Sequence, residues 1–179
     1  MTTLHIDSSI NGDTSASRAI SRSIVDQLAS DRLVYRDLVA EPLPHLTLDV
    51  FADTSVLDEF LAADTVVIGA PMYNFTLSSQ LKAWLDRILV AGKTFRYTES
   101  GPEGLAGGKR VIVALARGGM YDAGSPAAAL EHLESYLRGI FNFIGIEPEF
   151  VAADGLNFGP EQREASLNAA LGETMLLAA

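Results

Sequence analysis

The sequence predicts an α/β fold in which a doubly wound, five-stranded parallel sheet carries helices on both faces. Two observations lead to this prediction. Segments that suit buried strands alternate five times with segments of helical apolar spacing along the 179 residues. The clearest unit begins with the β-branched run Thr65–Ile68, continues through a loop, and enters a helical stripe made of Leu81, Trp84, Leu85, Ile88 and Leu89.

The expected strands are short and rich in apolar or β-branched residues. They cover Thr3–Asp7, Leu33–Tyr35, Thr65–Ile68, Arg110–Leu115 and Glu149–Ala153. Pro71 has no N–H group to donate, so we expect it to end the hydrogen bonding of the third strand. Five strands in a chain of this length favour the flavodoxin-like order 2-1-3-4-5 over a dinucleotide-binding arrangement. The first loop also lacks the G-x-G-x-x-G pattern that the second arrangement requires.

The helices are predicted from apolar positions that recur with helical spacing. The first begins after Ser15 or Ser17 as N-cap, and the third begins near Ser78. The others are a short helix after Asp53 or Thr54, one over residues 127–143 and one after Pro160. Two further stretches, Val39–Val50 with its prolines and Ala91–Gly108 with its glycines, are expected to be irregular connections.

Composition excludes several classes of function. The net charge of −10 and the isoelectric point near 4.6 disfavour nucleic acid and anionic membranes as partners. The absence of cysteine excludes disulfides, thiolate metal sites and cysteine nucleophiles. No signal peptide and no apolar run of membrane-spanning length are present, so we expect one cytoplasmic domain over residues 1–179. The histidines and acidic residues show no metal-ligand, triad or acid–base spacing, and no catalytic side chain is predicted.

Three loops are expected at the carboxyl edge of the sheet, where open α/β sheets bind ligands. The first, Ser8–Ser17, is rich in hydroxyl groups and leads into a helix N-terminus. Free N–H groups and the helix dipole favour a phosphate at such a place, and Ser9, Ser15 and Ser17 add donors. The alternative is an ordinary capped loop with surface serines.

The second loop, Met72–Phe75, carries large flat or flexible side chains where a plain connection would use Gly, Ser or Asp. It indicates the wall of a pocket for a flat ligand, and the alternative is a hydrophobic plug at the sheet edge. In the third loop, Ala116–Gly119, two glycines allow a ligand to approach the backbone, and Arg117 has donors for a polar edge. The alternative there is a glycine turn with a solvated arginine.

Long motifs give the chain a family resemblance. The stretches Pro71–Lys82, Ala91–Glu99 and Gly101–Leu105 resemble the FMN-dependent NADH-azoreductases, which are homodimeric flavodoxin-like quinone reductases. The resemblance covers nearly the whole chain and implies FMN as cofactor. It implies that the phosphate and ribityl end is held by Ser9, Ser15, Ala16 and Ser17. It implies that the isoalloxazine ring is lined by Met72, Tyr73, Asn74 and Phe75. It places at the pyrimidine edge Ala116, Arg117, Gly118 and Gly119.

The resemblance also implies the reaction, a ping-pong, two-electron hydride transfer from NADH or NADPH through FMN to a quinone or azo compound. Two departures from the family pattern bear on substrate preference. Ala116 stands where the family often has serine, and the stretch between Pro44 and Asp64 is shorter than in typical members. The physiological acceptor and the choice between NADH and NADPH stay open. The alternative functions are a flavodoxin-type electron carrier without nicotinamide turnover and a flavin-free interaction module.

Overall fold

The computed structural model describes residues 1–177, so the last two positions of the expected domain lie outside the described residues. Five parallel strands form the central sheet, in the spatial order β2-β1-β3-β6-β7. They are β1 (Thr2–Asp7), β2 (Arg32–Asp37), β3 (Thr65–Pro71), β6 (Arg110–Ala116) and β7 (Glu149–Ala153). Counted along the chain, this order is 2-1-3-4-5, which is consistent with the prediction. Each predicted strand is present, and most are longer than predicted by one to three residues.

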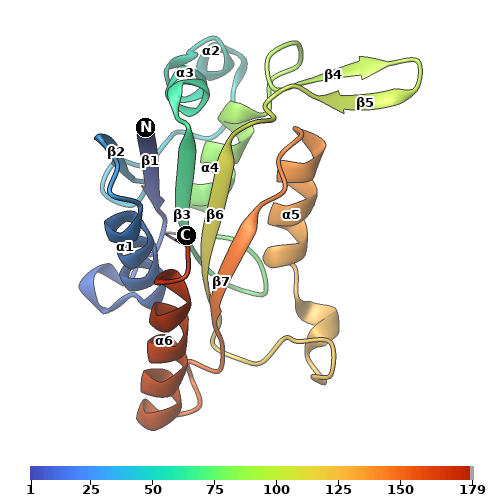
Figure 1. Ribbon diagram of the computed structural model, residues 1–179. Coiled ribbons are helices and arrows are strands. Elements are labelled where there is room, and N and C mark those ends of the chain that lie inside the picture. Colours follow the sequence, from blue (N-terminus) through green and yellow to red (C-terminus); the bar gives the residue numbers. More distant parts are fainter. Residues whose placement is uncertain (178–179) are drawn as a thin grey trace.

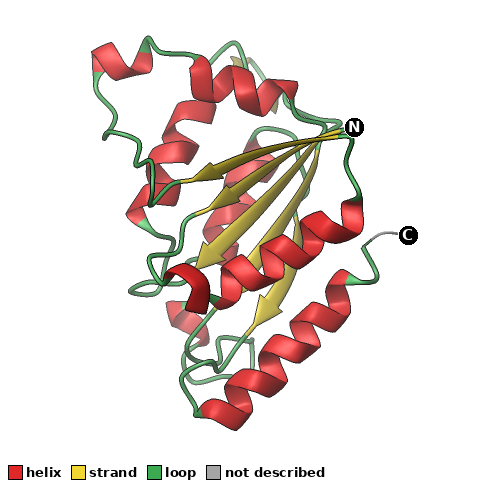
Figure 2. Cartoon of the chain, turned by 90° about the vertical axis from the view of Figure 1, so that its left-hand side faces the viewer, coloured by secondary structure: helices red, strands yellow, loops and turns green. Residues whose placement is uncertain are grey.

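Helices cover both faces of the sheet, as expected (Figures 1 and 2). One face carries α1 (Ala16–Leu28) and α6 (Pro160–Thr174), and the other carries α3 (Ser55–Ala62), α4 (Ser79–Ile88) and α5 (Glu134–Phe143). The largest fully buried side chains lie on the second face and are Trp84, Phe60 and Phe141. Each contributes roughly 1.5–3 kcal/mol or more by burial. Within the described part of the chain, no helix has both the length and the apolar character needed to cross a bilayer.

Local capping fixes where the predicted helices begin. Ser15 is the N-cap of α1, and its hydroxyl accepts from the N–H of Arg18 at 3.3 Å. Ser78 caps α4 in the same way, accepting from the N–H of Leu81 at 3.2 Å. Such caps satisfy N–H groups that have no partner inside the helix. Of the two candidates for the cap of the first helix, Ser15 is the N-cap, and the predicted helix start near Ser78 is confirmed. The caps place the start of each helix at the carboxyl edge of the sheet.

The two predicted connections contain regular structure. Residues 91–108 include the antiparallel hairpin β4 (Phe95–Thr98) and β5 (Gly101–Gly104), and the proline-containing stretch includes the short helix α2 (Leu48–Phe51). The hairpin is stabilised by tertiary contact, since the Phe95 ring packs against Phe143 of α5 with centroids 4.7 Å apart. The expectation of irregular structure in these stretches was therefore wrong.

Helix α5 begins at Glu134, seven residues later than predicted. The preceding turn Ala128–Leu130 is a separate 3₁₀ segment, and the apolar side chain of Leu130 in that segment is exposed. The start of α5 is set by Glu131, whose carboxylate accepts from the N–H groups of Leu133, Glu134 and Ser135 at 2.8–3.0 Å. These three bonds lower the pKa of Glu131 although burial alone would raise it. A carboxylate at a helix N-terminus is the favourable arrangement for the helix dipole.

The hairpin lies at the amino edge of the sheet, opposite the loops that follow the strands (Figure 1). Its base is pressed against the end of α5. A Cβ atom built on Gly104 would lie 2.2 Å from the backbone nitrogen of Gly145 and 2.2 Å from the carbonyl carbon of Ile144. Backbone atoms cannot move aside as a flexible side chain can, so only glycine fits at position 104.

Replacing Gly104 with alanine should therefore lower the free energy of unfolding by about 2 kcal/mol, as expected for overpacking. The matched control is Gly139→Ala in α5, where an added Cβ meets nothing within 4 Å. That variant should be as stable as wild type or more stable by ~0.5–1 kcal/mol, because alanine suits a helix interior better. Urea unfolding followed by circular dichroism measures both, and equal stability of the two variants would contradict the proposed contact.

Candidate functional site

The three predicted loops meet at the carboxyl edge of the sheet around a cavity of about 200 Å³. A fourth segment, which follows β7, closes it. The lining residues are Ser9, Asn11, Ser15 and Ala16 of the first loop, Pro71, Met72 and Tyr73 of the second, Ala116 and Gly118 of the third, and Leu156, Asn157 and Arg163 of the fourth segment.

Five of the predicted site residues are not on the wall of this cavity: Ser17, Asn74, Phe75, Arg117 and Gly119. The Ser17 hydroxyl is buried, 3.1 Å from that of Ser15. Asn74 lines a neighbouring hollow together with Met72 and Tyr73, and Gly119 lines another. These five residues belong to the three loops but do not line the cavity themselves.

Sequence reasoning missed the segment after the fifth strand, which brings Asn157 and Arg163 to the cavity. A signal was present, because the fifth parallel strand ends at the same edge as the others and its loop is subject to the same rule. Gly118 allows the close approach of this segment, since a Cβ there would lie 2.3 Å from Asn157 Nδ2. The Asn157 N–H donates to the Gly118 carbonyl at 3.0 Å, which holds the third loop and the fourth segment together.

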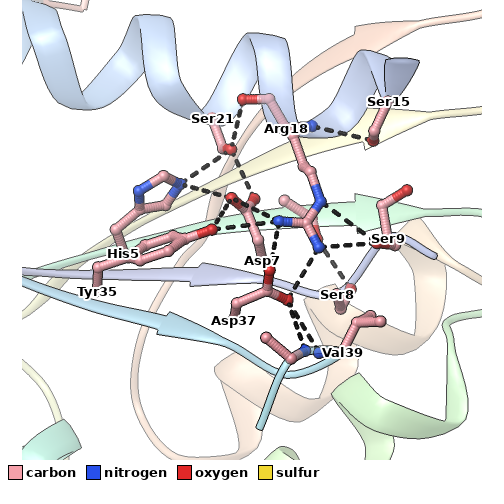
Figure 3. Close-up of polar contacts among 12 residues, drawn as sticks. His5, Asp7, Ser8, Ser9, Ser15, Arg18, Ser21, Tyr35, Asp37 and Val39 are labelled. Carbon is pink, nitrogen blue, oxygen red and sulfur yellow. Dashed lines mark hydrogen bonds and ion pairs between the residues drawn. The ribbon is translucent and has the colours of Figure 1, made fainter. Parts of the chain in front are cut away.

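An arginine holds the first loop in place (Figure 3). Arg18 donates from Nε and Nη2 to the carbonyl of Ser9, at 3.3 and 2.9 Å. Its two terminal nitrogens also donate to the carboxylate of Asp37, at 2.8 and 2.9 Å. Asp37 in turn accepts from the N–H of Val39 at 2.9 Å. The bond with Arg18 lowers the pKa of Asp37, and the same bond raises the pKa of Arg18.

A second set of polar contacts lies beside this pair (Figure 3). Asp7 is buried and accepts from the hydroxyl groups of Ser21 and Tyr35 at 2.9 and 3.1 Å. His5 Nε2 lies 3.0 Å from the Ser21 hydroxyl. Burial, with the Asp7 charge, raises the pKa of Tyr35 to about 12, so its hydroxyl remains a donor at neutral pH. Asp7 is therefore held by structural partners, and it does not line the cavity.

The second loop is a tight turn. Tyr73 and Thr76 exchange backbone hydrogen bonds of 2.9 and 3.1 Å, and the two residues between them, Asn74 and Phe75, have φ angles of +47° and +72°. This pair of positive φ angles is typical of a type I′ turn, which usually contains glycine. For phenylalanine the conformation costs about 1–2 kcal/mol. Strain of this kind is concentrated at functional sites, and here it supports the loop as part of a binding site.

The second loop is also tied to its surroundings. The Tyr73 hydroxyl accepts from the N–H of Ile10 at 3.1 Å and lies 3.2 Å from the Ser9 hydroxyl, so it joins the first and second loops. The Phe75 carbonyl accepts from the N–H of His132 at 3.1 Å. These contacts keep the strained turn in one conformation.

The Arg117 side chain contacts carboxylates and does not line the cavity. It is buried, and Nε and Nη2 donate to Asp154 at 2.5 and 2.8 Å, while Nη1 donates to Glu134 at 3.3 Å. Burial alone would lower the pKa of Arg117, but Asp154, Glu134 and Glu131 raise it. The guanidinium group is thus committed to carboxylates. A ligand beside the third loop would therefore contact its backbone and not the Arg117 side chain.

The chain is similar in sequence to known flavin-dependent enzymes. The sequence model of a family with the flavodoxin-like fold matches residues 1–175. The FMN-dependent NADH:quinone oxidoreductase 2 of Bradyrhizobium diazoefficiens is 56% identical over 193 aligned positions, which cover 96% of each chain. The FMN-dependent NADH:quinone oxidoreductase of Methylorubrum populi is 54% identical over 202 positions, which cover 100% of each chain. Both alignments are longer than the 179 residues of this chain, so these relatives carry residues without counterparts here.

Solved structures of azoreductases are also similar to this chain. The azoreductase AzrA superimposes with a TM-score of 0.91 at 29% identity, covering 99% of each chain. An FMN-dependent NADH-azoreductase from Bacillus anthracis, solved in complex with FMN, has a TM-score of 0.87 at 26% identity and covers 99% of this chain and 98% of that one.

The contact between Arg18 and Asp37 leads to a prediction about pH. The pKa of Asp37 in the folded state lies below the ordinary value of 3.8. The stabilisation by ionised Asp37 is therefore complete above pH 3.8 and is lost as the pH falls through the lower, folded-state pKa. Asp37→Asn should lower the free energy of unfolding by about 2 kcal/mol at neutral pH, because it removes a charge-assisted bond. The difference from wild type should shrink below about pH 4.

Unfolding in urea between pH 2.5 and 7 measures this difference. The control is Asp26→Asn, which removes a carboxylate paired with Arg22 where both side chains are more than half exposed. An exposed pair contributes little, so this variant should resemble wild type. A difference between Asp37→Asn and wild type that stays constant over the whole range would contradict the prediction.

Proposed function

The chain belongs to the flavodoxin-like family of FMN-dependent NADH:quinone oxidoreductases and azoreductases, and we propose that it is a single FMN-binding domain that reduces quinones and azo compounds with NADH or NADPH. The observation that carries this proposal is identity above 50% over 96–100% of relatives named FMN-dependent NADH:quinone oxidoreductase. The cavity at the carboxyl edge of the sheet supports it. We propose that the enzyme acts in the cytoplasm.

The residues around the cavity fit FMN. Ser9 and Ser15 provide hydroxyl donors beside the start of α1, where N–H groups and the helix dipole favour a phosphate. We assign the phosphate and ribityl end to this loop, with Ala16 and Ser17 at the first turn of the helix. Met72 and Tyr73 supply apolar and aromatic surface suited to a flat ring, with Asn74 and Phe75 completing the turn. Ala116–Gly119 offers its backbone at the pyrimidine edge. When bound, FMN supplies the hydride chemistry.

The protein's own part in the reaction is binding, orientation and hydrogen bonding. Two N–H groups of the second loop are used internally: that of Met72 donates to the Ala116 carbonyl at 2.9 Å, and that of Tyr73 donates to Thr76 at 2.9 Å. The N–H groups of Asn74 and Phe75 have no acceptor among residues 1–177. These two N–H groups can therefore donate to the flavin. The conformation of the turn leaves them without a partner within the loop. No proton-transferring side chain is assigned.

We propose that the enzyme is a symmetric homodimer. Within one chain the β4–β5 hairpin lies at the opposite edge of the sheet from the cavity, so it cannot line its own site (Figure 1). The hairpin nevertheless carries Tyr97, whose side chain is 75% exposed, and the turn of the second loop leaves Phe75 44% exposed. Exposed aromatic side chains at both edges of the sheet suit a twofold contact in which the hairpin of each chain covers the second loop of the other.

The central test is purification followed by steady-state kinetics. The protein should retain FMN non-covalently, as identified by mass spectrometry. It should oxidise NADH with a quinone, and double-reciprocal plots should give parallel lines because both substrates use the same position beside the flavin. A flavodoxin-type carrier would bind FMN but would not turn over NADH. Retention of no flavin would contradict the proposed FMN binding. Intersecting lines with a ternary complex would contradict the proposed ping-pong reaction.

The dimer makes a separate prediction. Dilution that dissociates it should lower turnover per chain in proportion, because each site would lose its second wall. Light scattering over a dilution series, with turnover measured in parallel at saturating FMN, checks this. A monomer with full activity would exclude the homodimeric site and leave the assignment of the cofactor intact.

A further inference from the structure

Arg163 is the charged residue among the cavity-wall residues that neither the sequence motifs nor the family resemblance singled out. It lies in the first turn of α6, next to the start of α1, and these two helices cover the same face of the sheet (Figure 2). Its side chain is half-buried, and Nη2 donates to the carbonyl of Thr14 at 2.7 Å. Thr14 immediately precedes Ser15, so the guanidinium group lies beside the hydroxyl-rich first loop. It lines the same cavity as Ser9 and Ser15.

The charge of Arg163 is not balanced by a carboxylate. Arg18 is paired with Asp37 at 2.8 Å, and Arg117 is paired with Asp154 at 2.5 Å. For Arg163, by contrast, no Asp or Glu oxygen lies within 4.0 Å among residues 1–177. The chain as a whole has a net charge of −10. An arginine without a carboxylate partner is notable on the wall of a polar cavity in such an acidic protein.

We propose that Arg163 binds the phosphate of FMN and supplies the positive charge that the serine loop lacks. This inference rests on the proposed function. The hydroxyl groups of Ser9 and Ser15 and the N–H groups of α1 are uncharged donors, whereas the phosphate is an anion in a protein whose overall field opposes it. Guanidinium groups suit phosphate oxygens in both charge and geometry. The bond to Thr14 uses one N–H and holds the side chain in place, which leaves its other donors for the ligand.

The variant Arg163→Gln keeps an amide donor and removes the charge. Titration of the apoprotein should show FMN bound about tenfold more weakly, which is the low end of the range for a bond to a charged group because the side chain is partly exposed. Riboflavin, which lacks the phosphate, should bind wild type and variant equally. The affinity of wild type for FMN should fall more steeply with salt than that of the variant. Arg163→Lys should retain most of the affinity.

The control is Arg22→Gln, which removes one positive charge from an exposed pair on α1. It should bind FMN as wild type does. Equal FMN affinity in wild type and Arg163→Gln would overturn the inference, as would an equal loss of FMN and riboflavin, which indicates a packing role. A loss in Arg163→Lys as large as in Arg163→Gln would also overturn it. Failure of wild type to bind FMN would instead refute the proposed function.

Discussion

The geometry of the candidate site depends on the contact between Arg18 and Asp37. This pair joins three elements, because Arg18 belongs to α1, Asp37 ends the edge strand β2, and the same guanidinium group donates to the Ser9 carbonyl of the first loop. An exposed ion pair would add little. This one is largely buried, bidentate and bonded to the backbone as well, which makes it both stronger and more specific in geometry. Removal of either partner would leave the other charge without compensation in a partly buried place.

Close approach of the backbone provides the second constraint on the site. Gly69 of β3 leaves the space that the Asp7 carboxylate occupies, since a Cβ there would lie 2.3 Å from Asp7 Oδ1. Gly118 leaves the space for the Asn157 side chain in the same way. The two glycines lie on adjacent central strands or just beyond them. The polar groups beneath the first loop and the amide beside the third loop therefore occupy volume that any other residue type would fill.

The sequence was sufficient for features that depend on local pattern. The strands, the helix starts near Ser15 and Ser78, and the burial of Trp84 follow from apolar periodicity and from the hydroxyl-bearing residues that precede the helices. Features that depend on distant partners could not be predicted. The side chain of Arg117 is turned away from the cavity by Asp154, 37 residues later in the chain, and the hairpin depends on its contact with α5.

The cavity, too, could be predicted only in part from the sequence. Its first three walls were predictable because loops at one sheet edge must be neighbours. Which side chains of those loops face inward was not predictable. Ser17 has the same residue type as the wall residues Ser9 and Ser15, and Phe75 is aromatic like the wall residue Tyr73. The start of α5 at Glu134 was also not predictable, because the residue that caps it is Glu131, whereas the usual capping residues are Ser, Thr, Asp and Asn.

The turn at Asn74 and Phe75 has a consequence for protein engineering. A phenylalanine at φ +72° stores strain that glycine would release, so heat-resistant variants obtained by directed evolution should accumulate glycine at this position. The same replacement would loosen a turn that presents two N–H groups in a fixed direction. Replacement of Phe75 by glycine would then raise thermal stability and lower catalytic efficiency. Selection for thermal stability alone would therefore reduce activity.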